Sequence, residues 1–193
     1  MNPLSDDWSS IQKIRPHRYK CGYCNALVSP DKGYPGVGGL ICICSGCNRP
    51  SYFETNPAPG VPKQIPGIPF GEPVRNLPDL VAKLYEEARI ASAAGAHTAA
   101  VLATRKLLMH IAVDQKAPTN KSFIEYVEYL AKNGFVPPNG QTWVDHIRKK
   151  GNEANHEIIL MTDSDSRDLI TFVEMLLKFI YEFPSRVPRA AAP

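Results

Sequence analysis

Four of the five cysteines stand in two Cys-x-x-Cys pairs, Cys21 with Cys24 and Cys44 with Cys47, and nineteen residues separate the pairs. Each pair places two thiolates on one tight turn, and two such turns facing each other complete a tetrahedral shell of sulfur. The spacing therefore predicts that these four cysteines bind one structural Zn²⁺ ion, and that the beginning of the chain is a zinc ribbon.

The fifth cysteine leaves one alternative open. Cys42 precedes Cys44 by two residues and lies on the same face of a short predicted strand, so it can replace Cys44 as a ligand. Only Cys44 completes a second Cys-x-x-Cys turn, so we expect Cys42 to be a small buried hydrophobe beside the metal. A disulfide framework is disfavoured, because the cysteine count is odd, most of the chain lacks cysteine and no signal peptide is visible. We expect a reducing, cytoplasmic compartment.

Short alternating segments flank the cysteines and predict the strands of the ribbon at residues 18–20, 40–44 and 51–54. Asn25 and Asn48 each follow one pair, and asparagine readily adopts the left-handed conformation, which favours two similar knuckles. A core of this size depends on its metal for folding.

Prolines divide the chain. They recur from Pro57 to Pro78, a density that excludes a regular helix and favours extended backbone. Phe70 and Val74 are too apolar for a free linker, so we expect part of this stretch to pack on the following domain. The sequence thus predicts a zinc ribbon over 1–56, a connector over 57–77, a helical domain over 78–184 and a flexible tail over 185–193.

Apolar residues recur at helical spacing from Pro78 onward, and Gly95 and Gly134 mark helix ends. The pattern predicts helices at about 78–94, 96–115, 120–133, 141–157 and from Ser164 toward 181. Five helices with short loops predict an antiparallel bundle, so we expect a mainly α chain with a small β ribbon in front. Charges interrupt every apolar run well before the ~20 residues of a membrane span, so we expect no membrane contact.

Four segments of the helical domain resemble a known family. They are residues 86–96, residues 99–108, the string Ile147-Arg-Lys-Lys-Gly-Asn-Glu-Ala-Asn-His156, and residues 179–184. Together they are similar to the domain of unknown function 4145 family over roughly residues 75–185, and through it to the HEPN superfamily of helical domains. The resemblance implies a bacterial or phage defence or counter-defence setting, a homodimer through the helical domain, and metal-independent endoribonuclease activity.

Arg148, Asn152 and His156 stand at positions i, i+4 and i+8, so a continuous helix would carry them on one stripe. His156 is the candidate general acid or base for a ribose 2′-hydroxyl, Arg148 would stabilise charge at phosphorus, and Asn152 would orient either group. HEPN nucleases keep four to six residues between arginine and histidine, whereas Gly151 occupies that arginine position here. A structural role therefore stays open, with Asn152 as a helix cap and His156 as a buried, hydrogen-bonded side chain.

Basic side chains near both motifs are candidates for contacts with nucleic acid, although the net charge of +3 is too small to indicate this alone. In the ribbon they interleave with Tyr19 and Tyr23, a composition suited to phosphates and stacked bases. The candidates are Arg15, Arg18 and Lys20 in the ribbon, and Arg105, Lys106, Lys149 and Lys150 in the helical domain. The four basic residues of the helical domain are explained equally well as part of a solvent-exposed helix face that binds no ligand.

Two functions follow from these patterns. The first is a nucleic-acid-binding, HEPN-like protein with RNA or DNA as its ligand and possible endoribonuclease activity. The second is a non-catalytic homodimeric scaffold or adaptor that binds a partner protein through the zinc ribbon. No nucleotide-binding loop, nucleophile triad or paired-carboxylate site is apparent, so other enzyme classes have little support.

Overall fold

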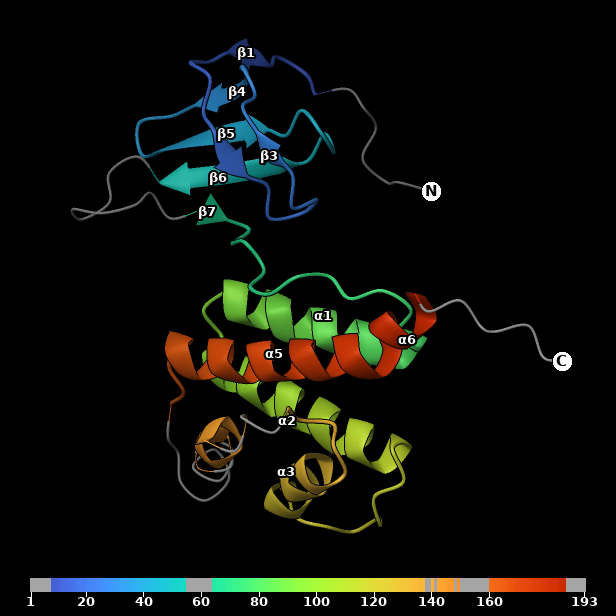
Figure 1. Ribbon diagram of the computed structural model, residues 1–193. Helices are drawn as coiled ribbons and strands as arrows, with labels where there is room; N and C mark the ends of the chain where they lie inside the picture. Colours follow the sequence, from blue (N-terminus) through green and yellow to red (C-terminus); the bar gives the residue numbers. More distant parts are fainter. Residues whose placement is uncertain are drawn as a thin grey trace, which may run out of the picture. The chain divides into compact units, whose positions relative to one another are not determined.

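Figure 1 shows a computed structural model of the protein, which describes residues 8–54, 64–137, 140, 142–147, 149 and 160–186. The chain divides into two compact units, Met1–Pro69 and Phe70–Pro193. The division falls inside the predicted connector. The two units are described separately below.

The first unit is built from two antiparallel sheets (Figure 1). The larger has five strands in the order β1-β4-β5-β6-β7, and β2 pairs with β3 in the smaller. The central strands β5 and β6 pair along their whole length, from Gly39 opposite Glu54 to Ile43 opposite Pro50. The strands are β1 (Gln12–Lys13), β2 (Tyr19–Lys20), β3 (Leu27–Val28), β4 (Lys32–Pro35), β5 (Gly39–Ile43), β6 (Pro50–Glu54) and β7 (Gln64–Ile65).

A small core holds these sheets together. In β6 the side chains of Ser51 and Phe53 are buried while Tyr52 and Glu54 are exposed, as the two-residue period of a strand requires. The ring of Tyr19 packs edge-on against Phe53 with 4.7 Å between centroids, and both rings are buried. The other buried members of this cluster are Ile14, Cys21, Cys42 and Cys44. Half of so small a core is cysteine, which leaves little apolar area to stabilise the unit without a metal.

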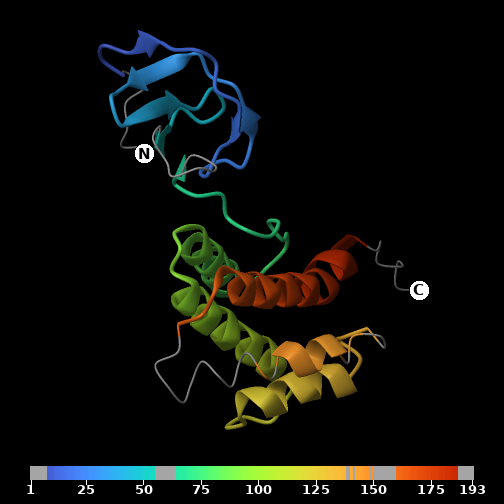
Figure 2. The same cartoon turned by 90° about the vertical axis from the view of Figure 1, so that its left-hand side faces the viewer.

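The second unit is helical, and α2 lies at its centre in contact with α1, α3 and α5 (Figures 1 and 2). Its position explains why α2 is buried on several sides, at Val101, Leu108 and Ile111 among others. The elements are α1 (Asp79–Ala93), α2 (His97–Asp114), α3 (Phe123–Lys132), a helical stretch at 142–147, α5 (Asp163–Leu177), the π-helical turn η2 (Lys178–Glu182) and α6 (Phe183–Arg186).

Local chemistry sets the helix ends. Gly95 and Gly134 follow the C-cap residues of α1 and α3 and have φ near +79°, a left-handed conformation that suits glycine. Ser122 and Glu125 form a capping box at the start of α3, and Thr162 and Asp165 form another at the start of α5. Within the described ranges, no helix has the length and apolar character needed to cross a membrane.

The stretch before α1 packs on the helical unit, as its apolar residues predict. Phe70, Val74 and Leu77 contact the helical core. The buried guanidinium of Arg89 donates hydrogen bonds to the carbonyl oxygens of Phe70 and Gly71, at 2.8 and 2.7 Å. These contacts fix extended backbone that has no helical or sheet partner of its own.

The prediction of a mainly α chain is wrong. The first unit is organised by sheets, with seven strands among its described residues, so the protein joins a β unit to an α unit. The sequence pattern favoured the helices because they are long, whereas β1, β2, β3 and β7 have two residues each. Two residues are too few to show a strand period. One of these strands, β7, lies within the proline-dense stretch.

Candidate metal centre

The two cysteine turns have the same backbone hydrogen bonds. In the first, the amide of Asn25 donates to the carbonyl of Cys21 over 2.9 Å. In the second, the amide of Asn48 donates to the carbonyl of Cys44 over the same distance. Asn25 and Asn48 have φ of 60° and 56°, so the expected left-handed asparagines are confirmed. Each turn is therefore a knuckle that directs both of its sulfur atoms to one side.

The four sulfur atoms gather in one cluster. All lie within 4.8 Å of one another, and Cys21 to Cys47 and Cys24 to Cys44 are both 3.8 Å apart. A tetrahedral zinc site with bonds of about 2.3 Å has ligand sulfurs about 3.8 Å apart. The cysteines form no disulfide. The cluster can therefore hold a metal ion such as zinc.

The chemistry of the donors also fits a cation. The amides of Tyr23 and Gly46 point at the sulfurs of Cys21 and Cys44 at 3.4 Å, as they would to support thiolates. Burial, together with the neighbouring sulfurs, raises the pKa of Cys47 to about 12. Thiolates this close repel one another, so a divalent cation is what allows all four to be deprotonated at neutral pH.

Cys42 is not part of this cluster, which leaves Cys44 as the third sulfur among the described residues. Its side chain is fully buried in β5, opposite Gly33 on one side and Ser51 on the other. Burial raises the pKa of its thiol to about 11, so the thiol stays protonated at neutral pH. This environment suits the small buried hydrophobe expected from the sequence.

The first knuckle is covered by the segment after β7. A side chain at Gly22 would place its Cβ 2.5 Å from the carbonyl oxygen of Pro66 and 2.6 Å from that of Gly67. The Gln64 amide group donates to the carbonyls of Lys20 and Pro66, at 2.9 and 3.1 Å. The knuckle thus requires glycine at position 22, because the backbone of residues 66–67 lies directly against it.

The predicted basic residues of the ribbon differ in exposure. Arg15 and Arg18 are exposed and Lys20 is half-buried, so all three remain candidates for surface contacts. Tyr19, expected to interleave with them, is 5% exposed and belongs to the core. Tyr23 is exposed, and the guanidinium of Arg49 lies over its ring at 5.0 Å from the centroid. Tyr23 belongs to the first knuckle and Arg49 follows the second, so their cation–π contact links the exposed surfaces of the two knuckles.

In the helical unit, Arg105 and Lys106 face in different directions. Arg105 is 5% exposed, and its guanidinium lies 4.5 Å from the ring centroid of Phe123. Its Nη1 atom has no hydrogen-bond partner in the part of the chain that the structure describes. Lys106 and Lys149 are exposed. Arg148, Lys150, Asn152 and His156 lie outside the described residues, so the catalytic stripe stays a prediction.

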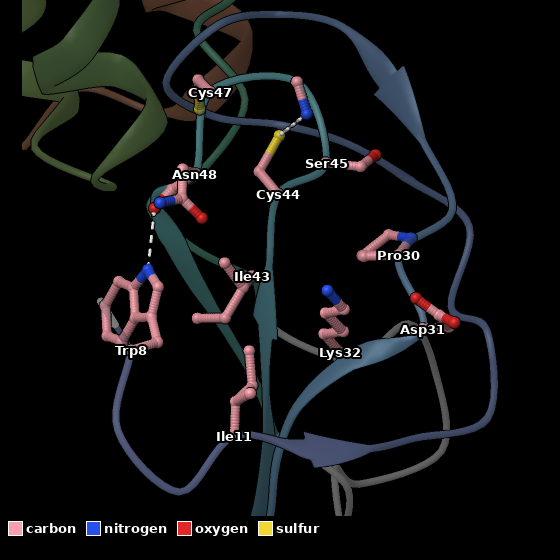
Figure 3. A pocket seen from close by; sticks show the side chains of 11 residues that line it. Trp8, Ile11, Pro30, Asp31, Lys32, Ile43, Cys44, Ser45, Cys47 and Asn48 are labelled. Carbon is pink, nitrogen blue, oxygen red and sulfur yellow. Dashed lines mark hydrogen bonds between the residues drawn. The ribbon is translucent and has the colours of Figure 1, made fainter. Parts of the chain in front are cut away.

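A groove beside the second knuckle contains residues that sequence reasoning missed (Figure 3). It has a volume of about 690 Å³, and its lining includes Trp8, Asp31, Lys32 and Asn48. The indole Nε1 of Trp8 donates to the backbone carbonyl of Asn48 over 3.1 Å, across 40 positions of sequence. No local pattern could have indicated this groove, because it forms only when β4 and the second knuckle come together in the folded unit.

Comparison with known proteins assigns the helical part of the chain. Residues 86–191, more than half of the 193 residues, match the family described as Domain of unknown function (DUF4145). The chain therefore belongs to the DUF4145 family, with the four-cysteine cluster upstream of the matched region. No curated protein and no solved structure matches it. The wider HEPN relationship stays a prediction.

Proposed function

We propose that the protein is a zinc-dependent nucleic-acid-binding member of the DUF4145 family, in which one Zn²⁺ ion bound by Cys21, Cys24, Cys44 and Cys47 organises the binding surface. The single observation that carries the proposal is the geometry of the four sulfurs, which matches a zinc tetrahedron. Structural zinc of this kind supplies the folding free energy that a small core lacks.

The charge of the described ribbon supports nucleic acid as the ligand. Residues 8–54 carry six lysines and arginines against two carboxylates. Four thiolates with one Zn²⁺ add two negative charges, which the nearest cations partly offset. Arg15, Arg18 and Lys20 follow one another just before the first knuckle, and the Arg49–Tyr23 pair supplies an exposed aromatic ring with a cation on it. Cations beside aromatic rings suit phosphates and unpaired bases.

Fluorescence anisotropy with labelled single-stranded RNA, single-stranded DNA and duplex DNA tests this proposal. The zinc-loaded protein is expected to bind at least one of them. The logarithm of its binding constant should fall linearly with the logarithm of the salt concentration. Arg18→Ala and Arg49→Ala should each weaken binding and lower the salt slope, whereas Lys132→Ala, an exposed lysine of α3, should not. Failure to bind any of the three at 50 mM salt would remove nucleic acid from the proposal.

The family resemblance extends this proposal to endoribonuclease activity in a defence or counter-defence setting. The same RNAs, incubated without divalent metal, should be cut to cyclic-phosphate ends by the wild-type protein and not by His156→Ala. Binding without cleavage would leave a nucleic-acid reader. A homodimer formed through the helical domain also stays a prediction. Sedimentation velocity measures the oligomeric state directly.

A second candidate function is a non-catalytic adaptor, and a groove between α1 and α2 favours it. The groove holds about 370 Å³ and is lined by Leu80, Leu84 and Leu107, with Leu80 77% exposed. Lys83 and Lys106 line it beside His110, against the single carboxylate of Glu87. These features suit an acidic amphipathic segment of a partner protein. Charge reversal in Lys83→Glu with Lys106→Glu should then abolish binding of such a segment while leaving binding of nucleic acid to the ribbon intact.

A further inference from the structure

The groove beside the second knuckle has one wall that is held rigidly in place. Trp8 forms this wall, and its only hydrogen-bond donor, the indole Nε1, is already used by the carbonyl of Asn48. Tyr34 lies against the indole with 6.3 Å between ring centroids, and its hydroxyl donates to the carbonyl of Ser9 over 2.7 Å. With its polar atom satisfied, Trp8 offers the groove a π surface and no free hydrogen bond.

The opposite wall carries two neighbouring charges of opposite sign. Asp31 directly precedes β4 and Lys32 begins it, and both line the groove (Figure 3). Neither side chain forms a hydrogen bond or ion pair with another described residue. Ile11 and Ile43 supply an apolar floor between the walls. A volume of about 690 Å³ falls in the range of sites that take small organic groups.

We propose that this groove is a base-binding pocket for single-stranded nucleic acid. The indole of Trp8 stacks on one nucleobase, the carboxylate of Asp31 accepts a hydrogen bond from an N–H group of that base, and the ammonium of Lys32 pairs with an adjacent phosphate. The inference rests on the nucleic-acid binding proposed above and assigns it a specific site. An unpaired base is required, because both faces of a base inside a duplex are already stacked.

The combination of groups favours a nucleotide over an acidic peptide. A nucleotide presents an anionic phosphate next to a planar ring that carries N–H donors, which matches an adjacent cation, anion and aromatic surface. The acidic side chains of a peptide would meet Lys32, but they carry no N–H group for the carboxylate of Asp31. They would also leave the indole surface unused.

The fluorescence of Trp8 can report binding at this site. The chain has two tryptophans, and Trp143 packs edge-on against Phe172 in the helical unit, so Trp143→Phe preserves an aromatic ring there and leaves Trp8 as the sole source of indole emission. The zinc-loaded Trp143→Phe protein is titrated with unlabelled single-stranded RNA dodecamers of uridine, cytidine or adenosine. Matched fluorescein-labelled dodecamers report total binding by anisotropy.

We expect saturable quenching of Trp8 emission with the same midpoint as the anisotropy change. Trp8→Ala should weaken binding about tenfold or more, Trp8→Phe should retain most of the affinity, and Asp31→Asn and Lys32→Ala should each weaken it several-fold. Zinc stoichiometry, measured for every variant, separates loss of a contact from loss of the fold. The quenching measurement, together with Asp31→Asn and Lys32→Ala, tests the site even where Trp8→Ala fails to fold.

Three results overturn the inference, and they differ from one another. Anisotropy binding without a change in Trp8 emission, and unaffected by Asp31→Asn or Lys32→Ala, retains nucleic-acid binding but places it elsewhere. Absence of any binding at 50 mM salt overturns the proposed function together with the pocket. Quenching by an oligoglutamate peptide and by none of the dodecamers assigns the groove to an acidic protein partner.

Discussion

The backbone amide of Arg75 donates a hydrogen bond to Oε2 of Glu182 over 3.0 Å, and so ties the segment before α1 to the end of η2. A parallel bond joins the amide of Glu72 to Oε2 of Glu174 over 2.9 Å. Two carboxylates, one on α5 and one at the end of η2, thus satisfy backbone donors of an extended segment more than 100 positions away. The side chain of Glu182 is 5% exposed, so water offers Arg75 little alternative.

This contact predicts a dependence of stability on pH. The Arg75 amide, helped by the charges of Arg186 and Lys178, lowers the pKa of Glu182 below its ordinary value. A lowered folded-state pKa stabilises the protein at pH values above about 4.3, the ordinary glutamate pKa, and this contribution is lost as the pH falls through the folded value. Glu182→Gln should therefore lower the Tm at pH 7 and much less near pH 3. An equal loss of Tm at both values would show that the charge is unimportant.

The metal cluster predicts different results for Cys47, which belongs to it, and for the buried Cys42, which does not. Cys47→Ser removes one of the clustered sulfurs and should abolish stoichiometric zinc binding, whereas Cys42→Ala should retain one zinc per chain. The Cys42 change removes only a small buried group, at a cost of about 1 kcal/mol. Elemental analysis of both purified variants measures the zinc directly. Zinc lost in Cys42→Ala and retained in Cys47→Ser would reverse the ligand assignment.

Two glycines of the first unit should respond differently to alanine. Gly22→Ala would force a Cβ against the backbone of residues 66–67, and we expect a cost of about 1–3 kcal/mol together with faster zinc release. Gly38→Ala serves as the control, because a Cβ there meets no atom within 4 Å. Competition with a chromogenic chelator measures zinc release from each variant. Similar release from both would contradict the close contact seen at Gly22.

Removal of zinc should affect only one unit. The first unit has a small core rich in cysteine, whereas the helical unit has a continuous apolar core around α2. Chelation should therefore abolish the near-UV signal and proteolytic resistance of residues 8–54, while the helical far-UV signal remains. Limited proteolysis followed by mass spectrometry locates the cleavages. Cleavage throughout the helical unit after chelation would show that its stability also depends on the metal.

Arg105 and Lys106 adjoin in sequence but should behave differently. The guanidinium of Arg105 is buried over Phe123, so Arg105→Ala should destabilise the helical unit by about 2–4 kcal/mol through lost packing. Lys106→Ala, at an exposed position, should change stability by less than about 0.5 kcal/mol. Thermal unfolding followed by far-UV circular dichroism compares them. A stable Arg105→Ala protein with impaired RNA binding would instead support the surface role expected from sequence.

The helix boundaries could be predicted from sequence because local signals mark them. Gly95 and Gly134 follow the ends of α1 and α3, and the capping residue Thr162 precedes the aspartates that begin α5. The cysteine spacing likewise indicated the sulfur cluster, since a knuckle is a local structure. Both kinds of signal depend on residues only a few positions apart.

Features that depend on distant pairing could not be predicted. Tyr19 looks like a surface aromatic between two basic residues, and only the packing against Phe53 shows that it is core. Lys32 meets the second knuckle through the register of β4 and β5, and Trp8 through its hydrogen bond to Asn48, neither of which a local pattern encodes. The burial of Arg105 likewise follows from α3 lying across α2, which places Phe123 over it.

The π turn of η2 has a consequence for how this helix varies among related sequences. In this turn the amide of Phe183 bonds to the carbonyl of Lys178, five residues back, so the turn holds one residue more than an α turn. Deleting one residue of this turn would restore α geometry and leave the following side chains facing nearly as they do now, because the π turn accommodates the extra residue. Relatives shorter by one residue at this point should therefore have a regular α turn here and keep the end of the helix against the segment before α1.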